Sequence, residues 1–336
     1  MTLNWFQGSP SIAAPQRPVV IESIDREALF GPAEYEADPA LRDAVNTALL
    51  LGQPLRLSGE PGTGKTQLAE KLAFELGLEL FKFETKSASI AQDLYYTFDH
   101  VARFQASQTP SADAGRLDPL QFIDYGPIGR AIVNSLDADA ARRLFPSRGL
   151  PLWFNGPRRS VVLIDEIDKA PSDFPNDVLN EVERHFFRIR EVEGGLTVAA
   201  ARDMRPVLVV TSNSERQLPD AFLRRCIFHH IQPISQERLE RIVLRRLASV
   251  GVRAGPLLED TLALFFALRT EAYDLRKRPS TAEYLSFVAA VFADAGVERS
   301  RRLDSTLACR HVATLVKSPD DLAAALQHPQ FRPARY

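Results

Sequence analysis

Apolar residues follow two patterns along the chain, and the change between them lies near residue 233. Before that point, short apolar runs alternate with segments whose apolar residues recur at helical spacing. Apolar runs of this kind are typical of strands in a parallel sheet that helices cover. The pattern predicts an α/β fold, a three-layer αβα core with a parallel sheet, whose strands are expected at 54–59, 78–85, 160–165, 205–213 and 227–231.

Helices are expected between these strands. Gly52 is placed to end a helix over 37–52, and further helices are predicted at 126–136 and 176–187. Gly194 and Gly195 mark the turn of a predicted hairpin. The apolar residues of the helix predicted at 65–77 share one face and are Leu68, Ala69, Leu72, Ala73 and Leu76.

After Pro233 the helical spacing continues alone, which predicts a smaller all-helical domain over 233–336 behind a core over 25–232. Ser280 with Glu283 forms a capping-box pattern, and Ser318 precedes a proline at the first helical position. Residues 1–24 are rich in Pro, Ser and Ala and are expected to form a loose arm. Helices are predicted at 234–251, 261–270, 280–296 and 318–327.

Composition narrows the class of protein. The 336 residues are 45% hydrophobic and 25% charged, as in a globular protein, and the formal charge of −2 disfavours an electrostatic nucleic-acid binder. Two cysteines exclude a disulfide scaffold and fit a reducing, cytoplasmic location. The N-terminus does not resemble a secretory signal, and no apolar run approaches the ~18 residues of a membrane span.

A complete Walker A sequence lies between strand 54–59 and helix 65–77. Its glycines let backbone N–H groups surround phosphate oxygens, and the helix that begins there adds its N-terminal dipole. Lys65 is expected to reach the β- and γ-phosphates of ATP, and the Thr66 hydroxyl to ligate Mg²⁺. The expected nucleotide-binding residues are Gly59, Glu60, Pro61, Gly62, Thr63, Gly64, Lys65 and Thr66.

Two carboxylates end the apolar strand 160–165. Ligands of parallel sheets bind outside the carboxyl ends of the strands, so Asp165 and Glu166 are expected to face the phosphate loop. Asp165 is predicted to hold Mg²⁺ through water, and Glu166 to act as the base for the attacking water. At the end of the next strand, Asn213 is expected to orient that water, rather than serve only as a turn residue.

Arginines follow in two places. Arg224 and Arg225 end a short predicted helix, and one of them could be an arginine finger for ATP in a neighbouring subunit or a cap for the last carbonyls. Arg276, Lys277 and Arg278 precede the helix that Ser280 caps, and one of them could contact the γ-phosphate or lie in an exposed loop. The residues alone leave both choices open.

Together these motifs resemble an AAA+ ATPase of the MoxR type over about residues 25–300. The AAA+ resemblance rests on 59–66, 161–171, Asn213 and 218–225. The MoxR resemblance rests on the sequences DEIDKAP (165–171), LNEVE (179–183), LPDAFLRR (218–225) and FIDYGPIGRAI (122–132).

The resemblance implies an αβα core with a helical lid, ATP bound between them, and a ring that is usually hexameric. Such proteins act as chaperone-like motors that remodel a protein partner, often with a von Willebrand factor A domain protein. By position, Lys65 and Thr66 would contact nucleotide and Mg²⁺, Asp165 and Glu166 would form Walker B, and Asn213 would be sensor 1.

Two positions depart from the family. Arg225 matches the arginine finger, but Arg224 replaces the Asp that normally precedes it. Arg278 is the candidate for sensor 2, although the family has its Arg after the proline, where this chain has Ser280.

The helix-2 insert, around residues 90–125, is enlarged relative to the family. Its aromatic residues could contact a partner, and core packing is expected for most of them: Tyr95, Tyr96, Phe98 and Phe104.

Other functions explain less of the sequence. A GTPase would need an NKxD sequence, which is absent, and a small-molecule kinase leaves Glu166 and the paired arginines unexplained. Two alternatives stay open. One is an AAA+ ATPase that acts on nucleic acid, as a clamp loader or helicase does, although the near-neutral charge of the chain weakens this alternative. The other is an ATP-gated scaffold that does not hydrolyse the nucleotide.

Overall fold

The computed structural model describes residues 21, 23–25, 29–108, 117–146, 148–213, 218–296 and 302–331. The predicted arm over 1–24 lies almost entirely outside the described residues, as do the side chains of most of the sequence 179–183. The chain divides into two compact units. We call Ala37–Glu60 with Lys65–Ile231 the sheet unit. The helical unit comprises residues from Gln232 onward, together with Pro61–Gly64 and the described residues before Ala37.

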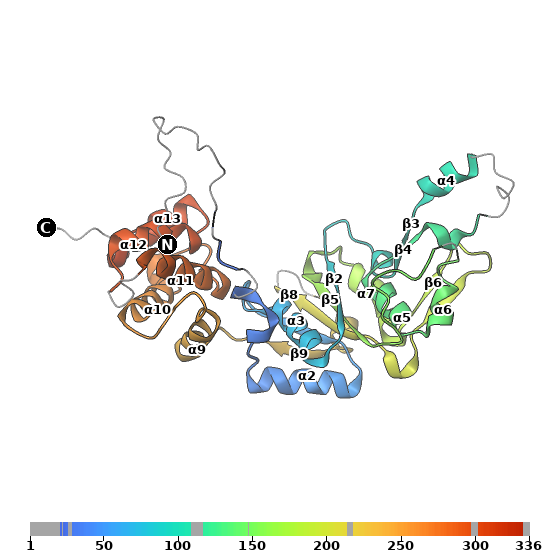
Figure 1. Ribbon diagram of the computed structural model, residues 1–336, viewed down its shortest axis with the longest axis horizontal. Coiled ribbons are helices and arrows are strands. Elements are labelled where there is room, and N and C mark those ends of the chain that lie inside the picture. Colours follow the sequence, from blue (N-terminus) through green and yellow to red (C-terminus); the bar gives the residue numbers. More distant parts are fainter. Residues whose placement is uncertain are drawn as a thin grey trace. The chain divides into compact units, whose positions relative to one another are not determined.

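The sheet unit is built on five parallel strands, as the apolar runs predict. Their order across the sheet is β2 (Glu79–Glu84), β5 (Ser160–Asp165), β8 (Val207–Ser212), β1 (Leu55–Ser58) and β9 (Ile227–His230). Strand order differs from chain order, so each connection crosses over through helices. The α/β class is confirmed (Figure 1).

Both faces of the central strands are buried, which explains their continuous apolar sequences. Val162 and Ile164 belong to a core cluster with residues of α5 (Pro127–Asn134) and α7 (Phe174–Arg184). The alternate residues, Val161 and Leu163, point to the opposite face and are completely buried as well. Helix α3 (Lys65–Leu76) contacts β5, and α2 (Pro39–Leu51) contacts β1 and β9. The result is the expected three-layer arrangement.

Helix ends agree with the sequence in part. Gly52 ends α2 with a left-handed φ of 64°, as predicted. Leu76 was expected on the buried face of α3, but it is the last residue of the helix and is 46% exposed. The helix predicted over 176–187 ends at Arg184, because His185 has a φ of 52° and the chain continues as a strand.

Two small antiparallel hairpins complete the sheet unit. β6 (Phe186–Ile189) pairs with β7 (Leu196–Ala199), which confirms the predicted turn at Gly194 and Gly195. β3 (Tyr96–Phe98) pairs with β4 (Ile123–Tyr125) within the segment 90–125, for which the sequence predicts no regular elements. Shorter elements of this unit are α4 (His100–Gln108), α6 (Ala138–Arg142) and α8 (Asp220–Leu223).

Some aromatic residues of the segment 90–125 lie in the core and others at the surface. Tyr95 and Tyr96 are buried and pack against Phe187, whereas Phe104 on α4 is 66% exposed. Gly129 on α5 permits this packing, because a Cβ atom there would lie 1.9 Å from the carbonyl oxygen of Tyr95. Core packing is therefore confirmed for the two tyrosines and wrong for Phe104.

The described residues of the helical unit share an apolar core. Its capping signals are confirmed: Ser280 Oγ accepts from Glu283 N, Glu283 Oε2 accepts from Ser280 N, and Ser318 caps the last helix. The sequence did not predict α12. The helices are α9 (Gln236–Arg246), α10 (Pro256–Leu268), α11 (Thr281–Ala295), α12 (Ser305–His311) and α13 (Pro319–Ala325).

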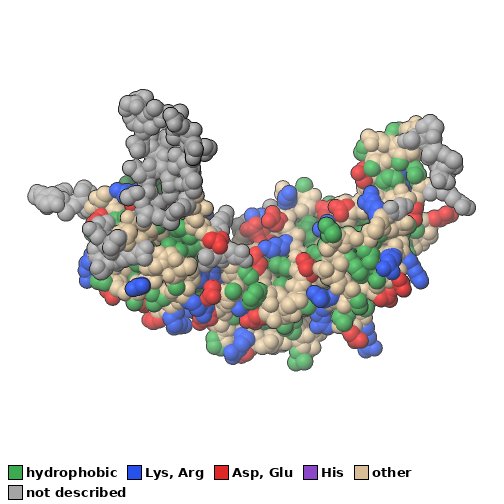
Figure 2. Space-filling model, viewed as in Figure 1, with side chains coloured by type: hydrophobic (Ala, Val, Ile, Leu, Met, Phe, Trp, Pro, Cys, Tyr) green, Lys and Arg blue, Asp and Glu red, His purple; other side chains and the backbone are tan. Residues whose placement is uncertain are grey.

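Acidic and basic side chains are interspersed over the face drawn in Figure 2. Within the described part of the chain, none of the helices combines the length and apolar character that crossing a bilayer requires.

Candidate functional site

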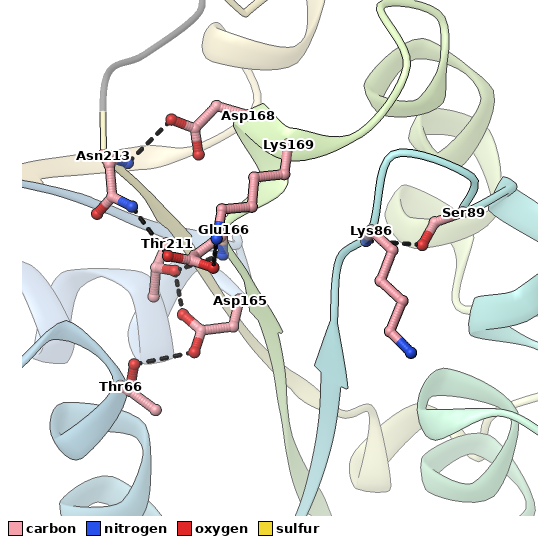
Figure 3. Close-up of polar contacts among 9 residues, drawn as sticks. All are labelled: Thr66, Lys86, Ser89, Asp165, Glu166, Asp168, Lys169, Thr211 and Asn213. Atoms are coloured by element: carbon pink, nitrogen blue, oxygen red, sulfur yellow. Dashed lines mark hydrogen bonds and ion pairs between the residues drawn. The ribbon is translucent and has the colours of Figure 1, made fainter. Parts of the chain in front are cut away.

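Polar side chains gather at the carboxyl edge of the sheet. β5 ends at Asp165 and its neighbour β8 ends at Ser212, and the two strands run parallel, so the residues that follow them meet at one edge. Figure 3 shows Asp165, Glu166 and Asn213 there, together with Thr66 at the start of α3. This is the edge at which parallel α/β sheets bind ligands.

Lys65 is buried within the phosphate loop. Its Nζ donates to the carbonyl oxygens of Gly59 at 2.7 Å and Glu60 at 3.0 Å. Burial lowers the pKa of the Lys65 amine, while the negative charge of Asp165 opposes that shift. Among the described residues its Nζ donates to carbonyl oxygens, and a buried ammonium group has strong donors to offer an anion.

Glycine allows the loop its turns. Gly62 and Gly64 have φ values of 76° and 90°, which lie in the region that L-residues with side chains rarely occupy. The loop therefore has the conformation for which its glycines were predicted.

Asp165 joins two hydroxyl groups. Thr66 Oγ1 donates to Asp165 Oδ2 at 2.9 Å, and Thr211 Oγ1 donates to Asp165 Oδ1. Hydroxyl and carboxylate oxygens are the ligands that Mg²⁺ prefers, so Thr66 and Asp165 fit a Mg²⁺ site between them. Thr211 was not predicted as part of the site, although it is a polar residue near the end of an apolar strand.

Glu166 is held from three directions. Its backbone has a left-handed conformation with φ 54°, uncommon outside glycine, and its N–H donates to Thr211 Oγ1 at 2.8 Å. Asn213 Nδ2 donates to Glu166 Oε1 at 3.0 Å, and Lys169 Nζ pairs with Oε2. The strained turn aims the carboxylate and its contacts fix it.

Asp168 and Lys169 continue the acidic strand end. The buried Asp168 accepts from the backbone N–H of Asn213 at 3.1 Å, which ties the end of β8 to the turn after β5. Neither residue was predicted for the site, although both lie in the DEIDKAP sequence. At the end of β2, Lys86 N donates to Ser89 Oγ at 2.9 Å, apart from this network (Figure 3).

The arginine candidates lie outside this network. Arg224 is exposed at the end of α8. Arg225 Nε pairs with Glu183 at 3.1 Å and its Nη1 donates to the Ala221 carbonyl at 2.9 Å, with the side chain 42% exposed. In the helical unit, Arg278 is exposed just before α11.

The neighbours of Arg278 are both paired. Arg276 pairs with Asp320 at 3.1 Å, and Lys277 pairs with Glu283 at 3.7 Å. Arg278 is therefore still the candidate for sensor 2, and this role stays a prediction.

Comparison with known proteins identifies a family that the chain matches. A family model described as AAA domain (dynein-related subfamily) matches residues 54–226, which include the phosphate loop, Glu166 and Asn213. No curated protein matches the chain in sequence.

Solved structures of Thermotoga maritima RuvB are similar at low identity. A point mutant has 16% identity and a TM-score of 0.47, covering 84% of this chain and 70% of its own. The protein titled as the Holliday junction branch migration motor has 15% identity and a TM-score of 0.45, covering 84% and 69%.

Proposed function

The chain belongs to the AAA domain family, dynein-related subfamily, and from this premise we propose that it is a MoxR-like AAA+ motor that hydrolyses ATP to ADP and phosphate. The observation that carries the proposal is the network around Glu166. A carboxylate that is oriented by Asn213 and Lys169, beside a Thr66–Asp165 pair, suits hydrolysis and is more than nucleotide binding needs.

Each residue then has a chemical role. Lys65 and the loop N–H groups bind the phosphates, Glu166 takes a proton from the attacking water, and Asn213 orients that water and the base. Thr66 and Asp165 would hold Mg²⁺. When bound, Mg²⁺ would supply positive charge against the phosphate oxygens.

The arginines support a ring. Arg225 takes no part in the Glu166 network and is exposed on its own subunit, so an arginine finger at this position would act on ATP of a neighbouring subunit. A closed ring of identical subunits, which we propose to be a hexamer, would give every site such a neighbour. The MoxR resemblance supports chaperone-like remodelling of a protein partner, with a von Willebrand factor A domain protein as a candidate.

Replacement of Glu166 by Gln tests hydrolysis. The amide keeps the shape of the side chain and removes the base, so Glu166→Gln should bind ATP with unchanged affinity and release phosphate at least ~10²-fold more slowly. Lys65→Ala serves as the contrasting variant, because it should lose nucleotide affinity itself. Phosphate release by Glu166→Gln within a few-fold of wild type would refute the assignment of the base.

A further inference from the structure

Four arginines lie at the edge of the sheet opposite to Asp165. Arg158 and Arg159 directly precede β5, and Arg202 and Arg205 shortly precede its parallel neighbour β8. β5 has six residues, so at about 3.3 Å per residue the two edges are on the order of 20 Å apart. We call these four residues the arginine edge.

Contacts within the sheet unit show that the two segments meet. Arg159 Nη2 donates to the carbonyl oxygen of Asp203 at 3.0 Å, which joins the start of β5 to the segment before β8. His185 lies beside them: burial first, then the charges of Arg205 and Arg159, lower its pKa to about 4. His185 is therefore neutral at pH 7 and lies within reach of the charges of Arg205 and Arg159.

Carboxylates do not neutralise this edge. None of its four arginines forms an ion pair with any described carboxylate, although Asp203 and Glu79 are on neighbouring backbone. Arg130, Arg142 and Arg225 of the same unit have an acidic partner, whereas other arginines, such as Arg143 and Arg224, have no ion pair among the described residues either, so what distinguishes the arginine edge is that four arginines lie on two adjoining segments. In a chain whose formal charge is −2, four guanidinium groups on adjoining segments form a local positive surface that a negatively charged partner would complement.

We propose that the arginine edge is a docking surface for an acidic segment of a protein partner. A guanidinium group presents a planar fork that binds a carboxylate through two hydrogen bonds. The neighbouring segments 134–160 and 199–206 contain no lysine, the compact cation that suits less directional contacts. Arg158, Arg202 and Arg205 are exposed, so their side chains are available to such a segment.

Nucleic acid fits this edge less well. Binding to a phosphate backbone gains its strength from many neutralised phosphates, whereas this edge has four cations with the exposed Asp203 among them. A polypeptide with spaced carboxylates matches that smaller, mixed surface. Because the edge is far from Glu166, a partner could stay bound there during ATP turnover, and the proposal does not depend on hydrolysis.

Binding of labelled probes to the full chain tests the proposal. The probes are a fluorescein-labelled peptide of alternating Glu and Ala, the matching Lys–Ala peptide, and single-stranded DNA of equal charge, followed by anisotropy at fixed salt. Wild type should bind the acidic peptide with a Kd below about 1 mM, bind the basic peptide more weakly, and bind DNA no better than the acidic peptide. Arg202→Glu/Arg205→Glu should weaken acidic-peptide binding at least ~10-fold.

A control of equal charge separates the edge from net charge. Arg42→Glu/Arg276→Glu changes two arginines that are 67% and 80% exposed elsewhere, and it should leave binding within about 2-fold of wild type. Arg202→Gln/Arg205→Gln should show a smaller loss than the Glu variant, since it removes charge without reversing it. Equal losses in the edge and control variants would overturn the proposal. So would tighter binding to DNA, or no binding of the acidic peptide below about 1 mM.

Discussion

The side-chain amide of Asn213 donates to Glu166 Oε1 at 3.0 Å and joins the ends of two neighbouring strands. The backbone of Asn213 is fixed as well, because its N–H donates to Asp168. The carboxylate is thus oriented by a side chain whose own position is set by a second contact. Such preorganisation is what a base requires before substrate arrives.

Asn213→Ala should therefore lower kcat by ~10²-fold while the affinity for ATP changes little, since a misplaced base affects the chemical step. Steady-state phosphate release with a separate nucleotide-binding measurement gives both numbers. Thr97→Ala, a change of an exposed residue in the insert, is the matched control and should behave as wild type. A large rise in KM at constant kcat would instead indicate that Asn213 binds ATP.

Lys169 should matter less than Asn213. Its pair with Glu166 is solvent-exposed, with the two side chains 45% and 37% accessible, and exposed ion pairs contribute about 0.2–1 kcal/mol. Lys169→Met should lower kcat by about 2- to 5-fold, and Lys169→Arg should restore most of it. The wild-type rate should also fall with added salt more than the rate of Lys169→Met. A loss as large as that of Glu166→Gln would mean that Lys169 has a direct catalytic role.

Loss of the Asp165 carboxylate should weaken the proposed Mg²⁺ site and so raise the Mg²⁺ concentration that hydrolysis requires. Asp165 has both oxygens bonded to threonine hydroxyl groups, and its replacement by Ala removes one of the two side chains proposed to hold Mg²⁺. Asp165→Ala should raise the Mg²⁺ concentration that gives half-maximal turnover at least ~10-fold, which a Mg²⁺ titration of phosphate release measures. An unchanged Mg²⁺ dependence would contradict the assignment of Asp165.

Much of this edge could be predicted from the sequence, because strand ends in a parallel sheet meet by geometry. That rule brought Thr66, Asp165 and Glu166 together and placed Asn213 beside them. It gave no information on Lys169 or Thr211, whose roles depend on the side-chain direction after the left-handed turn at Glu166. The available signal for Lys169 was its place in the DEIDKAP sequence. For Thr211 it was a polar residue near the end of an apolar strand.

Other features of the fold could not be predicted from local sequence periodicity. The insert packs Tyr95 and Tyr96 through long-range contacts with β6, so its short strands leave no clear periodicity. Periodicity also predicts which face of α3 is apolar. It does not predict how many turns of the helix are covered by other parts of the sheet unit, and Leu76 at the end of the helix is exposed. The helix predicted through Phe187 ends early because His185 adopts a conformation that helical spacing cannot reveal.

His185 should make the sheet unit less stable in acid. Its pKa of about 4 in the folded state is below the ordinary value of 6.5, so the unfolded chain binds the proton more readily. The free energy of unfolding should therefore fall as pH drops below about 6.5, by about 2 kcal/mol between pH 7 and pH 5 from this group alone. His185→Asn suits the left-handed backbone and cannot titrate, so denaturant unfolding should show a difference between the variant and wild type that shifts by that amount. A constant difference between the two proteins at both pH values would contradict this role.

The proposed ring and arginine finger can be tested in one mixing experiment. Arg225 is exposed and paired with Glu183 on its own subunit, so Arg225→Ala should bind ATP nearly normally and hydrolyse it ~10³-fold more slowly. Lys65→Ala should be equally inactive because it cannot bind nucleotide. In a mixture, some interfaces would join an intact phosphate loop from the Arg225→Ala subunit to an intact arginine from the Lys65→Ala subunit, and phosphate release should rise above that of either protein alone. Arg224→Ala mixed with Lys65→Ala is the control, since Arg224 has the same charge one position away. Restored activity in the control mixture only, from an Arg224→Ala protein that is inactive by itself, would move the finger to Arg224. If both single arginine variants stay active, hydrolysis does not depend on an arginine from a neighbouring subunit.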